Sequence, residues 1–126
     1  MKTNEAYRRL IDAMVIISGR SVSAGRTITY GHPVRPDAPD SALSDEEKKL
    51  KAIFARLNDQ DRQVLARAFL TEHQSGVHDV AALLQEATTN HNMKITWDGQ
   101  TVGANPSSTM QNDLIKRVGG EDWEKI

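Results

Sequence analysis

The chain has 126 residues, a formal net charge of −1 and no cysteine. This length predicts one domain whose core is large enough to fold without a disulfide or a structural metal. The absence of cysteine excludes disulfides, thiolate metal sites and a cysteine nucleophile. The longest apolar run, residues 13–17, is far shorter than the roughly 20 residues that cross a bilayer, and the N-terminus lacks the features of a signal peptide. We therefore expect a cytoplasmic protein with no membrane partner.

Charged side chains are unevenly distributed along the chain. Residues 1–36 carry six basic and two acidic side chains, whereas residues 37–126 carry ten basic and fifteen acidic ones. Such an asymmetry indicates either a binding surface for a charged partner or attraction between the two segments within one fold.

Apolar residues at helical spacing predict a first helix over residues 4–18. We expect Ile16 and Ile17 to widen its buried face and Gly19 to end it. The predicted face consists of Tyr7, Leu10, Ile11, Met14 and Val15.

Residues 20–42 are predicted to form a long irregular loop, because prolines recur there at every third position and disfavour a helix. Residues 27–30 are expected to add a short third strand to a small sheet. A connection of this length is uncommon inside a compact domain and is usually functional or mobile.

Two helices are predicted to follow the loop. Ser44 and Glu47 have the spacing of a capping box, which places the start of the second helix at Ser44. The third helix begins at Asn58 or Asp59, since either side chain can cap, and ends before Gly76. The expected buried faces are Leu50, Ile53, Phe54 and Leu57 in the second helix and Val64, Leu65, Ala68 and Phe69 in the third.

A fourth helix is predicted over residues 77–89. Ser75 would cap it, and Asp79 would lie in its first turn, where a carboxylate complements the helix dipole. The last helix opens with a second capping box formed by Ser108 and Gln111. The expected buried faces are Val77, Val80, Ala81, Leu84 and Ala87 in the fourth helix and Met110, Leu114, Ile115 and Val118 in the last.

Asp98 and Gly99 predict a β-hairpin, because both residue types accept the positive φ of a type I′ turn. This turn pairs Trp97 with Gln100 and thereby sets the register of both strands. The prediction for residues 1–126 is therefore a mainly α single domain with about five helices and one hairpin. The hairpin face expected against the helices consists of Met93, Ile95, Trp97 and Val102.

The sequence contains no complete catalytic motif. His78 and Asp79 could form an acid–base pair, but neighbouring residues on a helix point about 100° apart. The four histidines lack the spacing of metal ligands, and there is no nucleophile elbow or phosphate-binding glycine loop, so no metal and no cofactor is expected. Residues 77–90 contain no Lys or Arg, so a helix-turn-helix around Gly76 would lack phosphate contacts, and no nucleic-acid partner is expected.

Basic residues in the predicted loop are the first candidate binding residues. Arg20, Arg26 and Arg35 occur with no acid between them, which favours a site for an anion or an acidic partner. The alternative is a solvated loop whose arginines pair with the acidic remainder of the fold. Trp97 is the other candidate binding residue, as an exposed anchor or a packing anchor, while Trp123 is expected to fold back onto the core.

Three motifs occur in the second half of the chain: residues 76–80 (Gly-Val-His-Asp-Val), the turn over residues 97–99 (Trp-Asp-Gly), and the C-terminal pattern of Asp113, Arg117 and Trp123. Together they resemble a small bacterial family of unknown function, over roughly residues 57–123. The resemblance implies a small cytoplasmic protein and no established activity. It marks for testing Gly76, His78, Asp79, Asp98, Gly99, Asp113 and Arg117.

We expect a non-catalytic protein–protein interaction module, immunity-like or antitoxin-like by analogy, with an unidentified protein partner; the sequence also permits a homo-oligomer. The alternative is a small hydrolase or ligand-binding enzyme that uses His78 and Asp79 together with Asp113 and Arg117. This alternative requires the start of the fourth helix, the hairpin and the last helix to converge on one pocket.

Overall fold

The computed structural model describes residues 4–126, except for the side chain of residue 125. Its contacts divide the chain into two compact units. The terminal unit consists of Met1–Gly19 and Gln74–Ile126, and the central unit consists of Arg20–His73. The single domain expected from the length stays a prediction.

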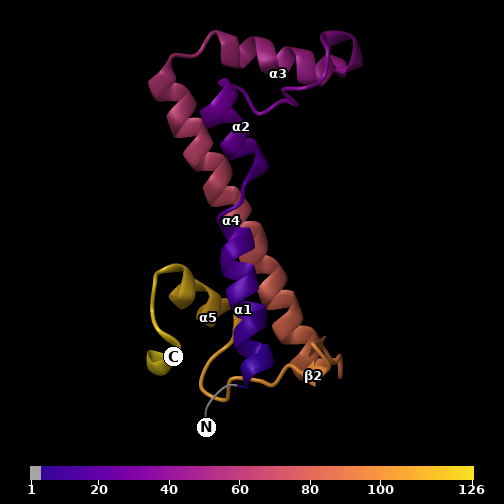
Figure 1. The fold of residues 1–126 in the computed structure, drawn as a ribbon, viewed down its shortest axis with the longest axis vertical. Coiled ribbons are helices and arrows are strands. Elements are labelled where there is room, and N and C mark those ends of the chain that lie inside the picture. The colour runs from indigo at the N-terminus through magenta and orange to yellow at the C-terminus, as the bar shows by residue number, and fades with distance from the viewer. Residues whose placement is uncertain (1–3) are drawn as a thin grey trace. The chain divides into compact units, whose positions relative to one another are not determined.

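The terminal unit contains most of the elements that the sequence predicts. They are α1 (Glu5–Ser18), the second part of α4 (Asp59–Asn90), β1 (Thr96–Trp97), β2 (Gln100–Thr101), α5 (Met110–Val118) and a short 3-10 turn (Trp123–Lys125). Helix α5 lies beside α1, as Figure 1 shows, and β1 also contacts α1.

The core of the terminal unit forms around the apolar face of α1. Leu10, Val15 and Trp123 pack against this core, as the sequence predicts. The prediction for Ile16 and Ile17 is wrong, because both side chains are largely exposed. The buried core residues are Ala6, Tyr7, Ile11, Met14, Ala81, Val102, Met110 and Leu114.

The hairpin forms in the predicted register, with Trp97 opposite Gln100. Asp98 and Gly99 have φ values of 49° and 79°, which fits the expected turn. One further bond joins the strands, from the Val102 N–H to the Ile95 carbonyl at 2.8 Å. Ile95, Trp97 and Val102 join the core, whereas Met93 is exposed, so the predicted face is confirmed except at Met93.

The central unit contains a helix where the sequence analysis predicts a loop. Helix α2 (Val22–Tyr30) occupies most of the first half of residues 20–42, so the irregular loop is wrong over residues 22–30 and so is the third strand over residues 27–30. Residues 31–39 contain no helix or strand. Ser21 caps this helix by accepting the Ala24 N–H at 3.1 Å, and Gly31 ends it with a φ of 81°. The prolines that suggested a loop begin only at Pro33, so they cannot prevent this helix.

Helix α3 (Asp45–Ala55) begins with the predicted capping box, in which Ser44 and Glu47 satisfy each other's backbone N–H. A one-turn 3-10 helix (Asp40–Ala42) precedes it. Phe54 is buried and its ring stacks on Phe69 of α4, at 6.1 Å between centroids. Leu50 and Ile53, which the sequence predicts to be buried, are exposed.

Helix α4 replaces the predicted third and fourth helices. Asn58 caps it by accepting the Asp61 N–H at 2.8 Å, and it continues through residue 76 to Asn90. The predictions that Gly76 breaks the helix, that Ser75 caps a new one and that Asp79 lies in a first turn are therefore wrong. A glycine inside a helix costs only about 1 kcal/mol relative to alanine, which the rest of a long helix can offset.

The last helix, α5, begins slightly later than predicted, because Thr109 rather than Ser108 is its cap. Its Oγ1 accepts the Asn112 N–H at 3.3 Å. Leu114 is buried as expected, whereas Ile115 and Val118 are exposed. The mainly α fold with one hairpin is confirmed, and the described residues contain no helix that is long and apolar enough to span a membrane.

Candidate functional site

Asp113 is the centre of a buried polar network in the terminal unit. Its carboxylate is fully buried in the first turn of α5. Oδ2 accepts the Tyr7 hydroxyl at 2.5 Å and the Asn105 amide at 2.9 Å. Among the described residues, Oδ1 has no hydrogen-bond partner. The network joins α1, the segment that precedes α5, and α5 itself.

The electrostatics of this network favour a protonated Tyr7. Burial raises the pKa of the Tyr7 hydroxyl well above its ordinary value of 10.0, and the hydrogen bond and charge of Asp113 raise it further. Tyr7 therefore remains a hydrogen-bond donor to Asp113 across the physiological range. A buried donor and acceptor that satisfy each other stabilise the packing of the helices that carry them.

Arg117 and Trp123 form a second cluster, on the same side of α1 as the C-terminal tail. Arg117 donates from Nε to Asp12 Oδ1 at 2.8 Å and from Nη1 to the Glu121 carbonyl at 2.8 Å. The Trp123 indole N–H donates to Asp12 Oδ2 at 3.1 Å. Both Asp12 oxygens are thus occupied by groups from α5 and the tail.

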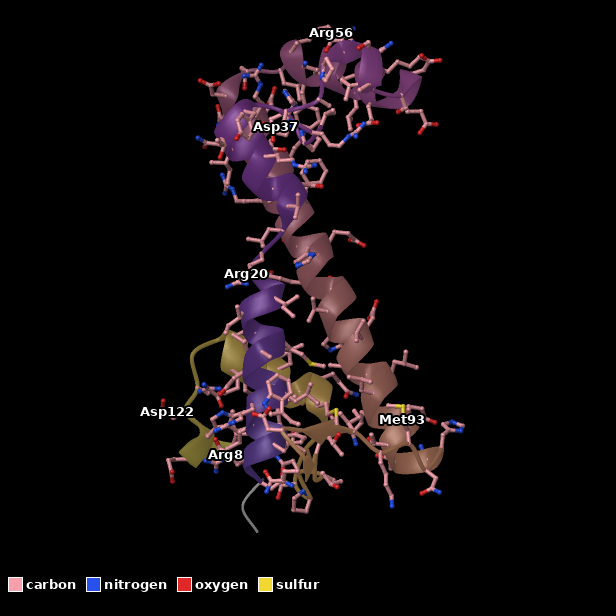
Figure 2. The ribbon with its side chains drawn as sticks, turned by 45° about the vertical axis from the view of Figure 1, so that its right-hand side comes forward. Arg8, Arg20, Asp37, Arg56, Met93 and Asp122 are labelled. Carbon is pink, nitrogen blue, oxygen red and sulfur yellow. The ribbon has the colours of Figure 1, made fainter. Side chains whose placement is uncertain are left out.

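Two guanidinium groups also lie over the indole ring of Trp123. The guanidinium carbon Cζ lies 5.2 Å from the ring centroid in Arg117 and 5.6 Å from it in Arg8. The Tyr7 ring packs edge-on against the same indole, at 6.1 Å between centroids. Figure 2 shows Arg8 on α1 close to the tail at Asp122. We call Arg8, Asp12, Arg117 and Trp123 the tail clasp, because their contacts hold the C-terminal tail on α1.

His78 and Asp79 lie on α4 and contact each other, with 3.7 Å between Nδ1 and Oδ1. The Asp79 side chain is 83% exposed. Within residues 4–126, no hydrogen bond or ion pair connects this pair with Asp113 or Arg117. The structure therefore brings Asp113 together with Tyr7 and Arg117 together with Asp12, and the shared catalytic role of all four candidates stays a prediction.

The candidate binding arginines have different environments in the central unit. Arg35 donates to both carboxylate oxygens of Glu47, each at 3.2 Å, and this hydrogen bonding lowers the pKa of Glu47. Arg20 precedes α2 and is exposed, while Arg26 lies within α2 and is half-buried. Neither of these two forms an ion pair with an acid in the described part of the chain. In the terminal unit, Trp97 is half-buried against the core.

Helix α2 exposes large apolar side chains that the sequence analysis did not identify. Val22 is 63% exposed, Ile28 74% and Tyr30 54%. A hollow of about 460 Å³ lies at its C-terminal end, and another of about 380 Å³ lies at its N-terminal end. The first is lined by Thr27, Ile28, Thr29, Tyr30, Gly31, Asp59, Arg62 and Gln63. The second is lined by Arg20, Ser21, Val22, Ser23, Phe69, Glu72 and His73.

One sequence signal could have revealed this surface. Val22, Arg26 and Tyr30 recur at four-residue spacing after Ser21, a residue type that commonly caps helices.

Residues 4–126 contain no group of three or more His, Cys, Asp or Glu side chains placed to hold a metal ion.

The fold and these clusters define a small, mainly α protein with a hairpin, a structural carboxylate network and an exposed central helix. A family model described as a family of unknown function (DUF6547) matches residues 1–125, and the chain belongs to this family. The resemblance to a small family of unknown function is thereby confirmed, and the match also includes the N-terminal helix and residues 20–42. No curated protein and no solved structure matches the chain.

Proposed function

We propose that the chain is a non-catalytic protein–protein interaction module whose binding surface is helix α2. The observation that carries the proposal is the exposure of Val22, Ile28 and Tyr30 on a nine-residue helix. Arg20 and Arg26, on and beside this helix, form no ion pair with an acid in the described residues. Exposed apolar side chains with arginines on the same helix are typical of protein-binding surfaces.

The physical basis is the removal of apolar surface from water when a partner covers α2. Each square ångström of apolar surface so covered contributes about 25 cal/mol before the costs of association. Tyr and Arg are the residue types that most often dominate binding energy at interfaces, and α2 offers Tyr30 and Arg26. The hollows at both ends of the helix can accept side chains of a partner.

The burial of Asp113 and the contacts of Arg117 within the terminal unit support a non-catalytic function. Asp113 is fully buried, and Arg117 is engaged by Asp12, Glu121 and the Trp123 ring. An enzyme of the kind considered above would need both groups free to reach a substrate. By analogy, the proposed module resembles a bacterial cytoplasmic protein that neutralises a toxin by binding it.

Site-specific photo-crosslinking tests the proposal. A photoreactive phenylalanine derivative would replace Tyr30, and the protein would be irradiated in cells that naturally produce it. We expect a covalent adduct with a protein, and at least tenfold less of it in the R20E/R26E variant. The same photoreactive residue at Thr89, an exposed position of the terminal unit, is the control. The absence of any protein adduct at position 30 would overturn the proposal.

A further inference from the structure

The C-terminal tail, residues 119–126, has Trp123 as its main side-chain contact with the rest of the terminal unit. This ring packs against the core, whereas the acidic side chains of the tail are exposed. The tail leaves α5 through Gly119 and Gly120, and Gly120 has a φ of 88°, which other residue types rarely adopt. A terminal segment held by few contacts opens at a lower free-energy cost than the whole unit.

The groups around the Trp123 ring recognise an indole specifically. Asp12 Oδ2 accepts the indole N–H at 3.1 Å, and the guanidinium groups of Arg8 and Arg117 lie over the ring. Tyr7 packs against its edge. An acceptor for the N–H distinguishes tryptophan from phenylalanine, and cations favour the indole face over other aromatic rings. We call Tyr7, Arg8, Asp12 and Arg117 the indole site.

The indole site also binds the backbone of the tail. Arg117 Nη1 donates to the Glu121 carbonyl, two residues before Trp123, at 2.8 Å. Every residue type offers such a carbonyl, so this contact recognises a peptide and not a particular side chain. Free indole and free tryptophan lack it. The side chains of Arg117 and Asp12 are 25% and 40% exposed even with the tail in place, so another chain can reach them.

We propose that the indole site binds a tryptophan-bearing segment of a partner protein, and that the tail blocks the site by placing Trp123 in it. The partner segment binds when the tail lifts at Gly119 and Gly120, so the docked tail lowers its apparent affinity. One hydrogen bond and the ring contacts favour the docked tail by roughly ten- to a hundredfold. This second site lies in the terminal unit and does not depend on the α2 surface.

Titration of the full-length W123A variant tests the site, because this substitution removes the competing ring. The probe is an acetylated peptide with the sequence of residues 120–126, and amide chemical shifts of the protein report binding. We expect W123A to bind the peptide about tenfold more tightly than the unmodified chain does. Binding by W123A that is no tighter than binding by the unmodified chain overturns the proposal.

Two altered probes test the chemistry of recognition. Methylation of the indole nitrogen of the peptide removes the N–H alone and should weaken binding about fivefold. N-acetyl-tryptophanamide keeps the ring but lacks the carbonyl that Arg117 binds, and it should also bind about fivefold more weakly. If the methylated peptide binds as tightly as the peptide, the indole is not recognised. If the amide does so, the site does not select a peptide segment, and the proposed partner is wrong.

A double variant tests the role of Asp12. D12A/W123A should bind the peptide about tenfold more weakly than W123A, because the N–H acceptor is lost. D79A/W123A is the matched control, since Asp79 is an exposed aspartate of the same unit, and it should bind as W123A does. Equal affinities for D12A/W123A and W123A overturn the proposal.

Fluorine NMR of the otherwise unmodified chain keeps the proposal testable if W123A fails to fold. Trp97 and Trp123 are the only tryptophans, so fluorinated tryptophan gives one resonance for each, and W123F assigns them. Excess peptide should move the Trp123 resonance toward its position in the unfolded chain and leave that of Trp97 unchanged. A Trp123 resonance that excess peptide does not move overturns the proposal.

Discussion

The two units differ in the polar side chains that they bury, whereas both expose large apolar side chains. In the terminal unit, the largest fully buried side chains are Tyr7, Ile11 and Asp113, and the polar members bind each other. In the described part of the central unit, Phe54 is the one buried aromatic side chain, while Ile28, Tyr30 and Ile53 are exposed. The buried polar network therefore belongs to the terminal unit, and the α2 surface that we propose for binding lies on the central unit.

Removal of the Asp113 carboxylate should have the largest effect, because it tests whether the terminal unit depends on this network. D113A leaves the Tyr7 hydroxyl and the Asn105 amide without their buried acceptor. We expect a loss of about 3 kcal/mol in the free energy of unfolding, since each unsatisfied buried donor costs about 1–3 kcal/mol. Urea denaturation followed by circular dichroism measures it.

Asp79 provides the matched control for this substitution. It is an aspartate of the same unit and its side chain is 83% exposed. Among the described residues, its one ion pair is a 3.7 Å contact with His78. D79A should change the free energy of unfolding by no more than about 0.5 kcal/mol. If D113A and D79A lowered the free energy of unfolding equally, the Asp113 network would not have the structural role described, and Asp113 would again be a candidate functional residue.

The tail clasp should give the next largest effect. W123A removes the ring contacts with Tyr7, Arg8 and Arg117 and the indole N–H bond to Asp12. We expect a loss of about 2 kcal/mol, less than the 3–5 kcal/mol typical of a fully buried tryptophan. W123F keeps an aromatic ring and should lose about 1 kcal/mol, mainly the hydrogen bond. If W123A unfolds at the same urea concentration as the unmodified chain, the tail is not held as described.

Local signals in the sequence predicted the terminal unit well. The spacing of apolar residues located α1, and the turn chemistry of Asp98 and Gly99 fixed the hairpin register, because both depend on neighbouring residues alone. The acceptor of the Tyr7 hydroxyl is 106 positions away, so no local pattern could have paired Tyr7 with Asp113. Trp123 was expected on the core, but its bond to Asp12 likewise required the fold.

Helices α2 and α4 are predicted less well, because single glycine and proline residues receive too much weight. The sequence predicts that a helix ends before Gly76, although a helix tolerates one glycine when its neighbours favour helix. The prolines after residue 32 predict a loop over the whole of residues 20–42, although a proline disfavours helix mainly at the one residue before it. Exposure on α2 and α3 was missed because periodicity marks an apolar face without showing what covers it.

Two glycine substitutions should have smaller and opposite effects, and they test the corrected helix boundaries. At Gly76 a Cβ would meet nothing within 4 Å, so G76A should stabilise the chain by about 0.5–1 kcal/mol through helix propensity. Gly31 has a φ of 81°, and a Cβ there would lie 3.2 Å from Arg62 Nη1, so G31A should destabilise by about 1–2 kcal/mol. A destabilising G76A would argue that the helix breaks at that residue, as the sequence first suggested.

The smallest effect expected is in the pH dependence of the free energy of unfolding. It should fall at high pH because of Tyr7 in the terminal unit and at low pH because of His32 in the central unit. Burial raises the pKa of Tyr7 in the terminal unit above 10.0, so the folded chain binds more protons than the unfolded chain above that pH. Stability should therefore be intact below pH 10 and fall above it. In the central unit, burial, aided by the charges of Lys51 and Arg62, lowers the pKa of His32 below 6.5. The unfolded chain then binds the extra proton, so this contribution is present above pH 6.5 and is lost as the pH falls.

Urea midpoints measured between pH 5 and 11 separate the two contributions. Relative to the unmodified chain, Y7F should flatten the decline above pH 10 and leave the acid side unchanged, whereas H32Q should flatten the decline below pH 6.5 alone. Both substitutions remove the titrating group and retain a side chain of similar size. If Y7F altered the acid limb, or H32Q the alkaline one, the assignment of each slope to its own unit would be wrong. The decline in stability above pH 10 would then not report Tyr7 alone, or the decline below pH 6.5 would not report His32 alone, although the pKa shift of each group has its causes within its own unit.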